Sequence, residues 1–201
     1  MAYRRDAIPY SVHARTLLAS RPPLVIYDVE TTGLDELNVP APRIWELAAV
    51  RRDGQGRVEA SRIVNCGMPI PAAANVAGVD PELPLKEGAD PREVLIRFAT
   101  FLDGAVLVGH NITGFDNAIL VAEYVRHGLV PPAALTDIRR CVDTLNLSRS
   151  LFPKDEPGSP ARYGLGAMAE HLGIPVDGTA HRALADVLVC EKLFDALAAR
   201  L

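Results

Sequence analysis

The stretch LVIYDVE, residues 24–30, joins an apolar run to two carboxylates that lie two positions apart. A β-strand directs alternate side chains to the same face, so Asp28 and Glu30 should point the same way at the carboxyl end of this strand. Two neighbouring like charges are unfavourable unless a cation or a proton lies between them. The pair is therefore a candidate metal-ligand set, and the alternative is a solvated strand end.

A third carboxylate follows another apolar run further along the chain. The run AVLVG, residues 105–109, has the pattern of a short buried strand, and HNITGFD, residues 110–116, follows it directly. A helical apolar pattern begins after these residues, which places Asp116 near the start of a helix. A carboxylate at that position either caps the helix or joins the first two acids, and the local pattern leaves both roles open.

The last amphipathic stretch, near residues 181–199, opens with HRALAD at residues 181–186. Asp186 should lie in the first turns of this helix. His181 is five positions earlier, which an ideal helix would separate from Asp186 by about 140° around its axis. We therefore expect His181 in the preceding loop, where it is either a mobile residue near the acids or an ordinary surface histidine.

These segments together resemble a known family. Three segments resemble, in order and in spacing, the three exonuclease motifs of the DnaQ-like 3′-to-5′ exonucleases of the DEDDh type. They are DVETTGL at residues 28–34, HN at 110–111 with FD at 115–116, and HRALAD at 181–186. Further similar strings are RIWELAAV at 43–50, DTL at 143–145 and YGL at 163–165. The resemblance covers about residues 24–200. It implies an α/β, ribonuclease-H-like fold with a mixed five-stranded sheet flanked by helices.

The resemblance also implies a catalytic arrangement. Asp28 should bridge two Mg²⁺ or Mn²⁺ ions, Glu30 and Asp186 should complete the water-activating site, and Asp116 should act on the second ion. His181 should be the general base, since histidine can accept a proton at neutral pH. Such ions prefer hard oxygen donors, and a pair of them stabilises the attacking and leaving oxygens of phosphodiester hydrolysis.

The substrate contacts follow from the same resemblance. Thr31 and the backbone near it should meet the terminal 3′-hydroxyl, and Leu34 should pack against the terminal base. His110 and Asn111, in the second motif, are the other candidate substrate-binding residues. Apolar contact with a base tolerates any sequence, which suits an enzyme that trims ends.

Three other residues near the motifs are interpreted differently. Glu46 lies between Trp45 and Leu47 in a predicted strand, so it faces either the acid cluster or solvent, and it is left out of the catalytic set. Asp143 is interpreted as a structural acid at a strand end or helix cap. Phe115 is assigned to the core.

Composition limits the classes of function. The 201 residues are 49% hydrophobic and carry a formal net charge of -4, which suits one globular domain with a sizeable core. An acidic chain does not favour broad electrostatic binding of long nucleic acid, although gripping a few terminal nucleotides needs no basic surface. Three cysteines without paired spacing predict reduced thiols. The sequence has no apolar stretch long enough for a membrane anchor, so none is predicted. We expect a cytoplasmic protein without a membrane partner.

The predicted layout divides the chain into an N-terminal helical extension, residues 1–23, and an exonuclease domain, residues 24–201. A loop rich in asparagine and proline should follow the first strand up to residue 42, and proline-rich loops should follow the third strand up to about residue 90. The predicted strands are 24–30, 44–52, 57–65, 105–109 and one near Cys141, with a hairpin turn at 53–56. The predicted helices are 11–20, 91–102, 115–127, 144–151, 164–172 and 181–199.

The expected function is stepwise release of nucleoside 5′-monophosphates from 3′ ends, with DNA favoured over RNA as the partner. An exoribonuclease of the same family and a non-catalytic nucleic-acid-binding module are the alternatives. All four acids and the histidine are present, which favours an enzyme. The chain ends directly after the third motif's helix, so a free-standing nuclease is expected, and a DNA polymerase or a second copy of the chain remains an open protein partner.

Overall fold

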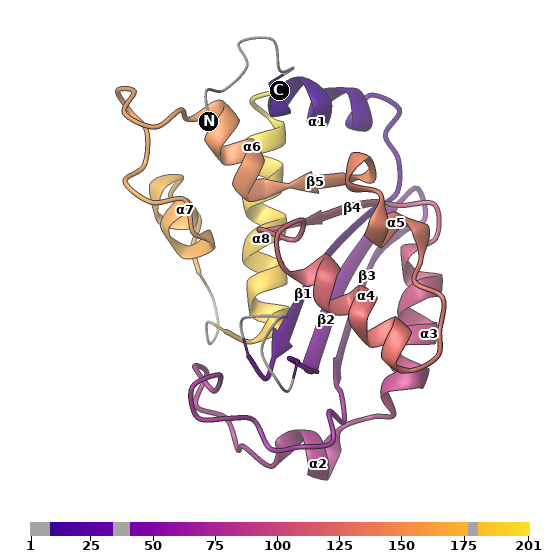
Figure 1. The fold of residues 1–201 in the computed structure, drawn as a ribbon. Helices are drawn as coiled ribbons and strands as arrows, with labels where there is room; N and C mark the ends of the chain where they lie inside the picture. The colour runs from indigo at the N-terminus through magenta and orange to yellow at the C-terminus, as the bar shows by residue number, and fades with distance from the viewer. Residues whose placement is uncertain (1–8, 34–40, 177–180) are drawn as a thin grey trace.

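A five-stranded mixed sheet forms the centre of the molecule (Figure 1). The computed structural model describes residues 9–33, 41–176 and 181–201. The strand order is β3-β2-β1-β4-β5; β1, β2 and β3 pair antiparallel, whereas β4 and β5 run parallel to β1. The strands are β1 Leu24–Thr31, β2 Ile44–Asp53, β3 Gly56–Ile63, β4 Val106–Gly109 and β5 Cys141–Asp143.

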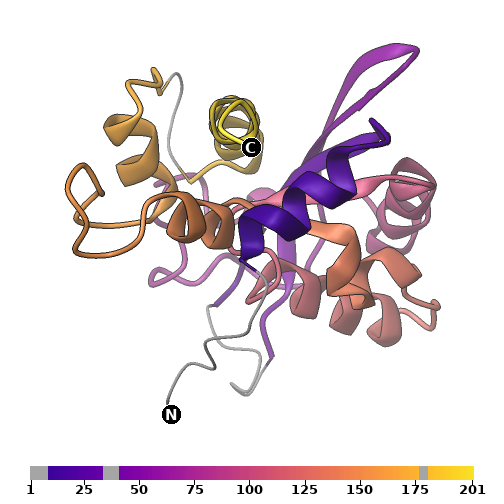
Figure 2. The ribbon, with the colours of Figure 1, turned by 90° about the horizontal axis from the view of Figure 1, so that it is seen from above.

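Helices cover both faces of this sheet (Figure 2). On one face, apolar residues of α3 and α4 and of the short α5 pack on β1, β2 and β4. On the other face α8 crosses the sheet, and α1, α6 and α7 complete that layer. The helices are α1 Tyr10–Leu18, α2 Leu83–Glu87, α3 Pro91–Leu102, α4 Asp116–Arg126, α5 Ala133–Thr136, the 3₁₀ turn Ile138–Arg140, α6 Thr144–Leu151, α7 Leu165–His171 and α8 Ala183–Ala198.

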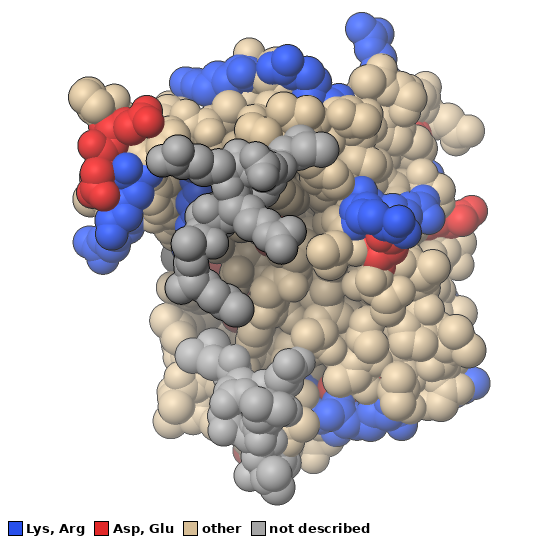
Figure 3. All heavy atoms as spheres, turned by 45° about the horizontal axis from the view of Figure 1, so that its top comes forward, with Lys and Arg blue, Asp and Glu red and all other residues tan. Residues whose placement is uncertain are grey.

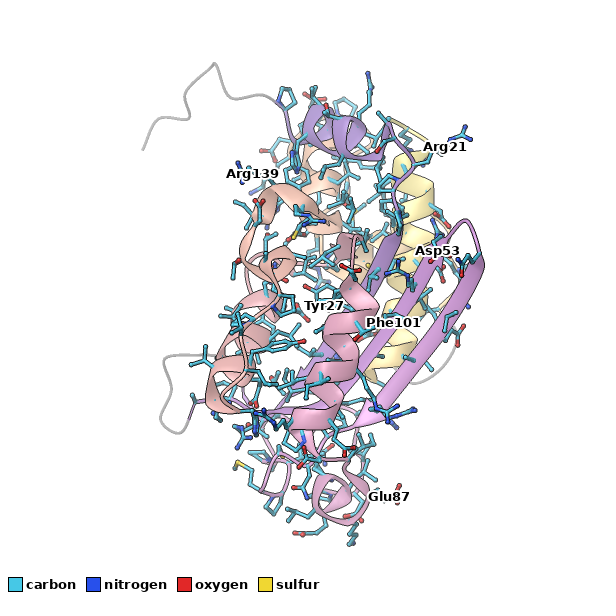
Figure 4. All side chains as sticks on the ribbon, turned by 90° about the vertical axis from the view of Figure 1, so that its right-hand side faces the viewer. Arg21, Tyr27, Asp53, Glu87, Phe101 and Arg139 are labelled. Atoms are coloured by element: carbon cyan, nitrogen blue, oxygen red, sulfur yellow. The ribbon has the colours of Figure 1, made fainter. Side chains whose placement is uncertain are left out.

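The alternation along β1 decides which face carries the acids. Tyr27 is buried in the layer of α3 and α4 (Figure 4). Its ring and that of Phe98 form an edge-to-face pair with 5.6 Å between centroids. Ile26 packs in the layer of α8. Because side chains alternate along a strand, Asp28 and Glu30 share the face of Ile26 and project toward α8.

The carboxyl end of β1 extends beyond its neighbour β4. The parallel pairing of the two strands ends at Ile26 and Val108, and the chain then turns sharply after Gly109. A Cβ at Gly109 would lie 2.1 Å from a side-chain carbon of Ile112, so only glycine fits this turn. The last residues of β1 are therefore not paired with β4, and other groups can approach them there.

The predicted fold class is confirmed, and the predicted elements agree with the structure within about two residues at most boundaries. Asp53 and Gly56 pair across the predicted hairpin. Two short helices, α2 and α5, were not predicted. The last helix begins at Ala183 rather than at residue 181, which leaves His181 in the preceding bend, as the angular argument predicted.

Helix α1 lies within the region predicted as an N-terminal extension. Its Ala14 is fully buried against the α8 layer, and the backbone N–H of Ser11 donates to Ser150 Oγ of α6 at 3.1 Å. The proposed domain boundary at residue 23 stays a prediction. Across the described part of the chain, no helix has both the length and the apolar character needed to cross a membrane.

Candidate active site

Three carboxylates from distant parts of the chain converge on one face of the sheet. Asp28 and Glu30 come from the end of β1, and Asp186 comes from the first turn of α8. One carboxylate oxygen from each residue lies within 4.8 Å of the other two. The packing of α8 across β1 and β2 brings this set together, because it places the amino end of the helix over the carboxyl end of β1.

Asp116 approaches the same strand end from the other side. It is the first residue of α4, and its Oδ1 accepts a hydrogen bond of 3.2 Å from the backbone N–H of Val29, between the two acids of β1. The residue at the cap position is Phe115, which packs on the core as predicted and makes no side-chain cap. Asp116 therefore ties the start of α4 to β1, and it is the first residue of the helix rather than its cap residue.

Burial is the largest cause of the raised pKa values of these acids. Burial raises the pKa of Asp28 well above its ordinary range, and the charges of Asp116, Glu30 and Asp186 raise it further. Burial also raises the pKa of Glu30 to about 7, where repulsion by Asp186 and Glu46 exceeds the opposing effect of Arg182. Burial raises the pKa of Asp116 to about 7.

This donor set fits divalent cations. Clustered carboxylates repel one another when charged, and a cation placed among them removes the repulsion that raises their pKa values. The donors are hard oxygens, which Mg²⁺ and Mn²⁺ prefer over nitrogen or sulfur. Asp28, Glu30 and Asp186 can hold one such ion, whereas Asp116 lies outside this group of three and acts on Asp28 through its charge.

His181 lies in the bend directly before α8. Its side chain is exposed, and its backbone has a positive φ of 63°, an uncommon conformation for a residue other than glycine. Burial raises the pKa of Asp186, while the His181 charge and its backbone N–H act in the opposite direction. His181 is therefore close to the carboxylate set without being held inside it.

The predicted substrate-binding residues occupy two regions. The hydroxyl of Thr31, at the end of β1, donates to the backbone carbonyl of Gly33. His110 Nδ1 lies 2.9 Å from Thr144 Oγ1, in the turn after β4. Asn111 adopts a positive φ of 66° in the same turn. Leu34 lies outside the described residues, and the substrate roles of all four residues stay predictions.

Asp143 organises the turn that carries His110 and Asn111. It is fully buried and caps α6 by accepting the backbone N–H of Leu145 at 3.0 Å. It also accepts the backbone N–H groups of Asn111 at 3.0 Å and Thr113 at 3.1 Å. Its assignment as a structural cap acid is confirmed.

Sequence reasoning missed one residue of this region, Glu46. Its side chain is only 2% exposed, and it pairs directly with Glu30 across β1 and β2, so both carboxylates lie on the same face. Its charge raises the pKa of Asp28 and Glu30, which places it toward the acid cluster rather than solvent. The register shifts beside this pair, at Trp45, so simple alternation could not assign the face. A glutamate inside the apolar run IWELAAV was the available signal.

Basic side chains are scattered over the face of the molecule shown in Figure 3. On the face shown in Figure 3, Lys and Arg form separate groups and no continuous basic band is visible among the described residues. The whole chain carries a net charge of -4. Tracking a long nucleic-acid backbone would favour a basic stripe, which this face lacks.

Comparisons with known proteins agree on one family. The family model RNase_T, described as Exonuclease, matches residues 25–194. The chain is 31% identical over 175 residues to a PolC-type DNA polymerase III of Streptococcus thermophilus, covering 86% of this chain and 11% of that protein. It is 30% identical over 184 residues to Exonuclease DPD1, chloroplastic/mitochondrial, of Arabidopsis thaliana, covering 87% of this chain and 55% of that protein.

The fold is also similar to that of solved structures. Escherichia coli Exonuclease I in complex with a dT13 oligonucleotide superimposes with a TM-score of 0.71 at 18% identity, over 90% of this chain and 41% of that chain. At this identity the similarity establishes the ribonuclease-H-like fold. The chain thus spans about an eighth of the PolC-type relatives, and about half or less of the other two proteins.

Proposed function

The chain belongs to the DnaQ-like exonuclease family, and from this premise we propose that it is a metal-dependent 3′-to-5′ exonuclease that releases nucleoside 5′-monophosphates from DNA ends. The observation that carries the proposal is the convergence of Asp28, Glu30 and Asp186, with one oxygen of each within 4.8 Å of the others. Asp116, bonded at Val29, completes the four-carboxylate set.

The carboxylates are the proposed ligands of two Mg²⁺ or Mn²⁺ ions. When bound, such ions offset the charge that develops on the attacking and leaving oxygens of an in-line displacement. Asp28 would contribute to both ions, which is supported by the charges of Asp116, Glu30 and Asp186 that all act on it. Glu30 and Asp186 are assigned to the side of the attacking water, and Asp116 to the other side.

His181 is the proposed general base. Its exposed position before α8 allows its imidazole to reach a water molecule beside Asp186. It would take one proton from that water as the oxygen attacks phosphorus and the bond from phosphorus to the 3′-oxygen breaks. The products are a nucleoside 5′-monophosphate and a strand that is one nucleotide shorter, with a free 3′-hydroxyl.

The preference for DNA and the substrate contacts are part of the proposal. The solved structure with a similar fold contains a DNA oligonucleotide, which supports DNA as the ligand class. Thr31 and Leu34 are proposed to hold the terminal nucleotide, and His110 and Asn111 to contact the strand. Docking to a DNA polymerase and a cytoplasmic location also remain proposals; the PolC-type relatives support the first of these.

Digestion of labelled oligonucleotides tests the proposal. With Mg²⁺ or Mn²⁺, 5′-labelled single-stranded DNA should shorten one nucleotide at a time from its 3′ end, and nucleoside 5′-monophosphates should accumulate. EDTA should stop the reaction, because the carboxylates alone cannot neutralise the leaving oxygen. RNA of the same sequence, run in parallel, should be degraded more slowly. Shortening from the 5′ end, or no shortening of any substrate with either ion, would contradict the proposal.

A further inference from the structure

Glu46 is a buried carboxylate that the catalytic set does not use. It lies opposite Glu30 on the same face of the sheet, where two like charges side by side are destabilising. A carboxylate that is 2% exposed must be paired and hydrogen-bonded to be tolerated. Its partners therefore indicate what holds it there.

Both oxygens of Glu46 are bonded to the segment that begins α8. Arg182 Nε donates to Oε2 at 2.9 Å and its Nη2 donates to Oε1 at 3.0 Å, which is the two-point pairing that only a guanidinium can make. The backbone N–H of Ala183 donates to Oε2 at 3.2 Å. Glu46 thus acts as the cap that α8 lacks locally, since the cap residue Arg182 makes no side-chain cap of its own.

The bonded segment lies between two proposed catalytic residues. Arg182 directly follows His181, whose positive φ of 63° is an unfavourable backbone conformation that surrounding contacts must hold in place. The carbonyl of Arg182 accepts a hydrogen bond of 3.0 Å from the backbone N–H of Asp186, and this bond closes the first turn of α8. Fixing Arg182 therefore fixes the backbone of both His181 and Asp186 relative to β1 and β2.

We propose that the Glu46–Arg182 pair is a positioning device that holds His181 and Asp186 against Asp28 and Glu30. This inference rests on the proposed nuclease function and extends it to residues that touch neither metal nor substrate. The pair acts on the geometry of the reacting groups, so its loss lowers kcat and leaves KM nearly unchanged.

The chain contains a matched control at the other end of the same two elements. Arg52 of β2 binds Asp195 of α8 through Nη1 at 2.8 Å and Nη2 at 2.9 Å, and it also reaches Glu191 at 3.4 Å. This pair joins the same strand to the same helix, but it lies near the carboxyl end of α8, away from His181. Loss of a bidentate ion pair can therefore be separated from loss of positioning.

The test variants are Glu46→Gln, Arg182→Lys and the double variant that combines these two changes. The control variants are Asp195→Asn and Arg52→Lys. We expect each of the first two to lower kcat on single-stranded DNA by about 10- to 100-fold, as outer-sphere partners of metal ligands do, with KM changed less than about threefold. The double variant should be no slower than the slower single variant, because the residues act as one unit. The control variants should stay within about twofold of the unmodified protein.

Hydrogen exchange and Mn²⁺ affinity provide readouts that do not need turnover. The amides of Ala183 and Asp186 should exchange faster in Glu46→Gln than in the unmodified protein, and at the unmodified rate in Asp195→Asn. The Mn²⁺ dissociation constant should rise about 10- to 100-fold in Glu46→Gln only. If the unmodified protein degrades no substrate, the proposed function fails, and these two readouts still decide the positioning role. Unchanged kcat in folded Glu46→Gln, or full activity in Arg182→Lys, would overturn the inference.

Discussion

The Asp28→Asn variant is expected to lose about 10³-fold or more of the exonuclease rate. Asp28 shares the carboxylate group with Glu30 and Asp186, so an amide there should remove a charge that the proposed cations need. Stabilisation of transition-state charge by bound metal contributes several kcal/mol, and each 1.36 kcal/mol corresponds to a tenfold change in rate. The measurement is kcat/KM on single-stranded DNA with Mn²⁺, beside Asp195→Asn, whose carboxylate binds Arg52 far from the site.

Unfolding of the same variant without metal distinguishes this loss from misfolding. Burial and the neighbouring acids raise the pKa of Asp28 in the folded protein. The protonated carboxyl is therefore tolerated at low pH, and the free energy of unfolding falls as the pH rises from the ordinary pKa of about 4 through the raised pKa. An amide carries no such penalty, and Asp28→Asn should therefore have a higher free energy of unfolding at pH 7 in EDTA. A variant that is at least as stable and still degrades DNA at the unmodified rate would refute the assigned site.

Removal of the proposed general base is the second large effect. The His181→Ala variant is expected to lower kcat by about 10²- to 10⁴-fold, the usual contribution of a positioned acid or base. Mn²⁺ affinity should change little, because the proposed ligands are the carboxylates. The variables to measure are kcat and the Mn²⁺ dissociation constant.

His171→Ala is the control for this change. His171 ends α7 and meets the ring of Phe152 edge-on with 5.2 Å between centroids, so its removal should leave kcat within about threefold. If His181→Ala keeps the unmodified kcat, His181 is a surface residue and another group must accept the proton. Loss of Mn²⁺ binding in His181→Ala would instead indicate a ligand role.

Local pattern was sufficient where one element decides the outcome. The alternation along LVIYDVE placed Asp28 and Glu30 on one face, and the angular argument separated His181 from α8. Convergence with Asp186 was available only from the family resemblance, because nothing in either segment records how α8 crosses β1.

The residues that pattern could not assign depend on tertiary contacts. Asp116 looked equally like a helix cap, and only the tertiary hydrogen bond from the Val29 N–H, at the end of β1, shows that it reaches the strand. Glu46 was ambiguous because the register shifts at Trp45 and because its partner, Arg182, is 136 positions away. The short helices α2 and α5 lie in regions with proline and have too few turns for a recognisable apolar period.

The central claim is that Asp28, Glu30, Asp116 and Asp186 together hold two divalent ions. Crystals grown with Mn²⁺ and a deoxynucleoside 5′-monophosphate, measured for anomalous scattering, test it most directly. The predicted result is two anomalous peaks, both within coordinating distance of Asp28, one of them shared with Glu30 and Asp186 and the other on the side of Asp116. A map with no anomalous peak near Asp28, or with Mn²⁺ bound only elsewhere in the molecule, would contradict it.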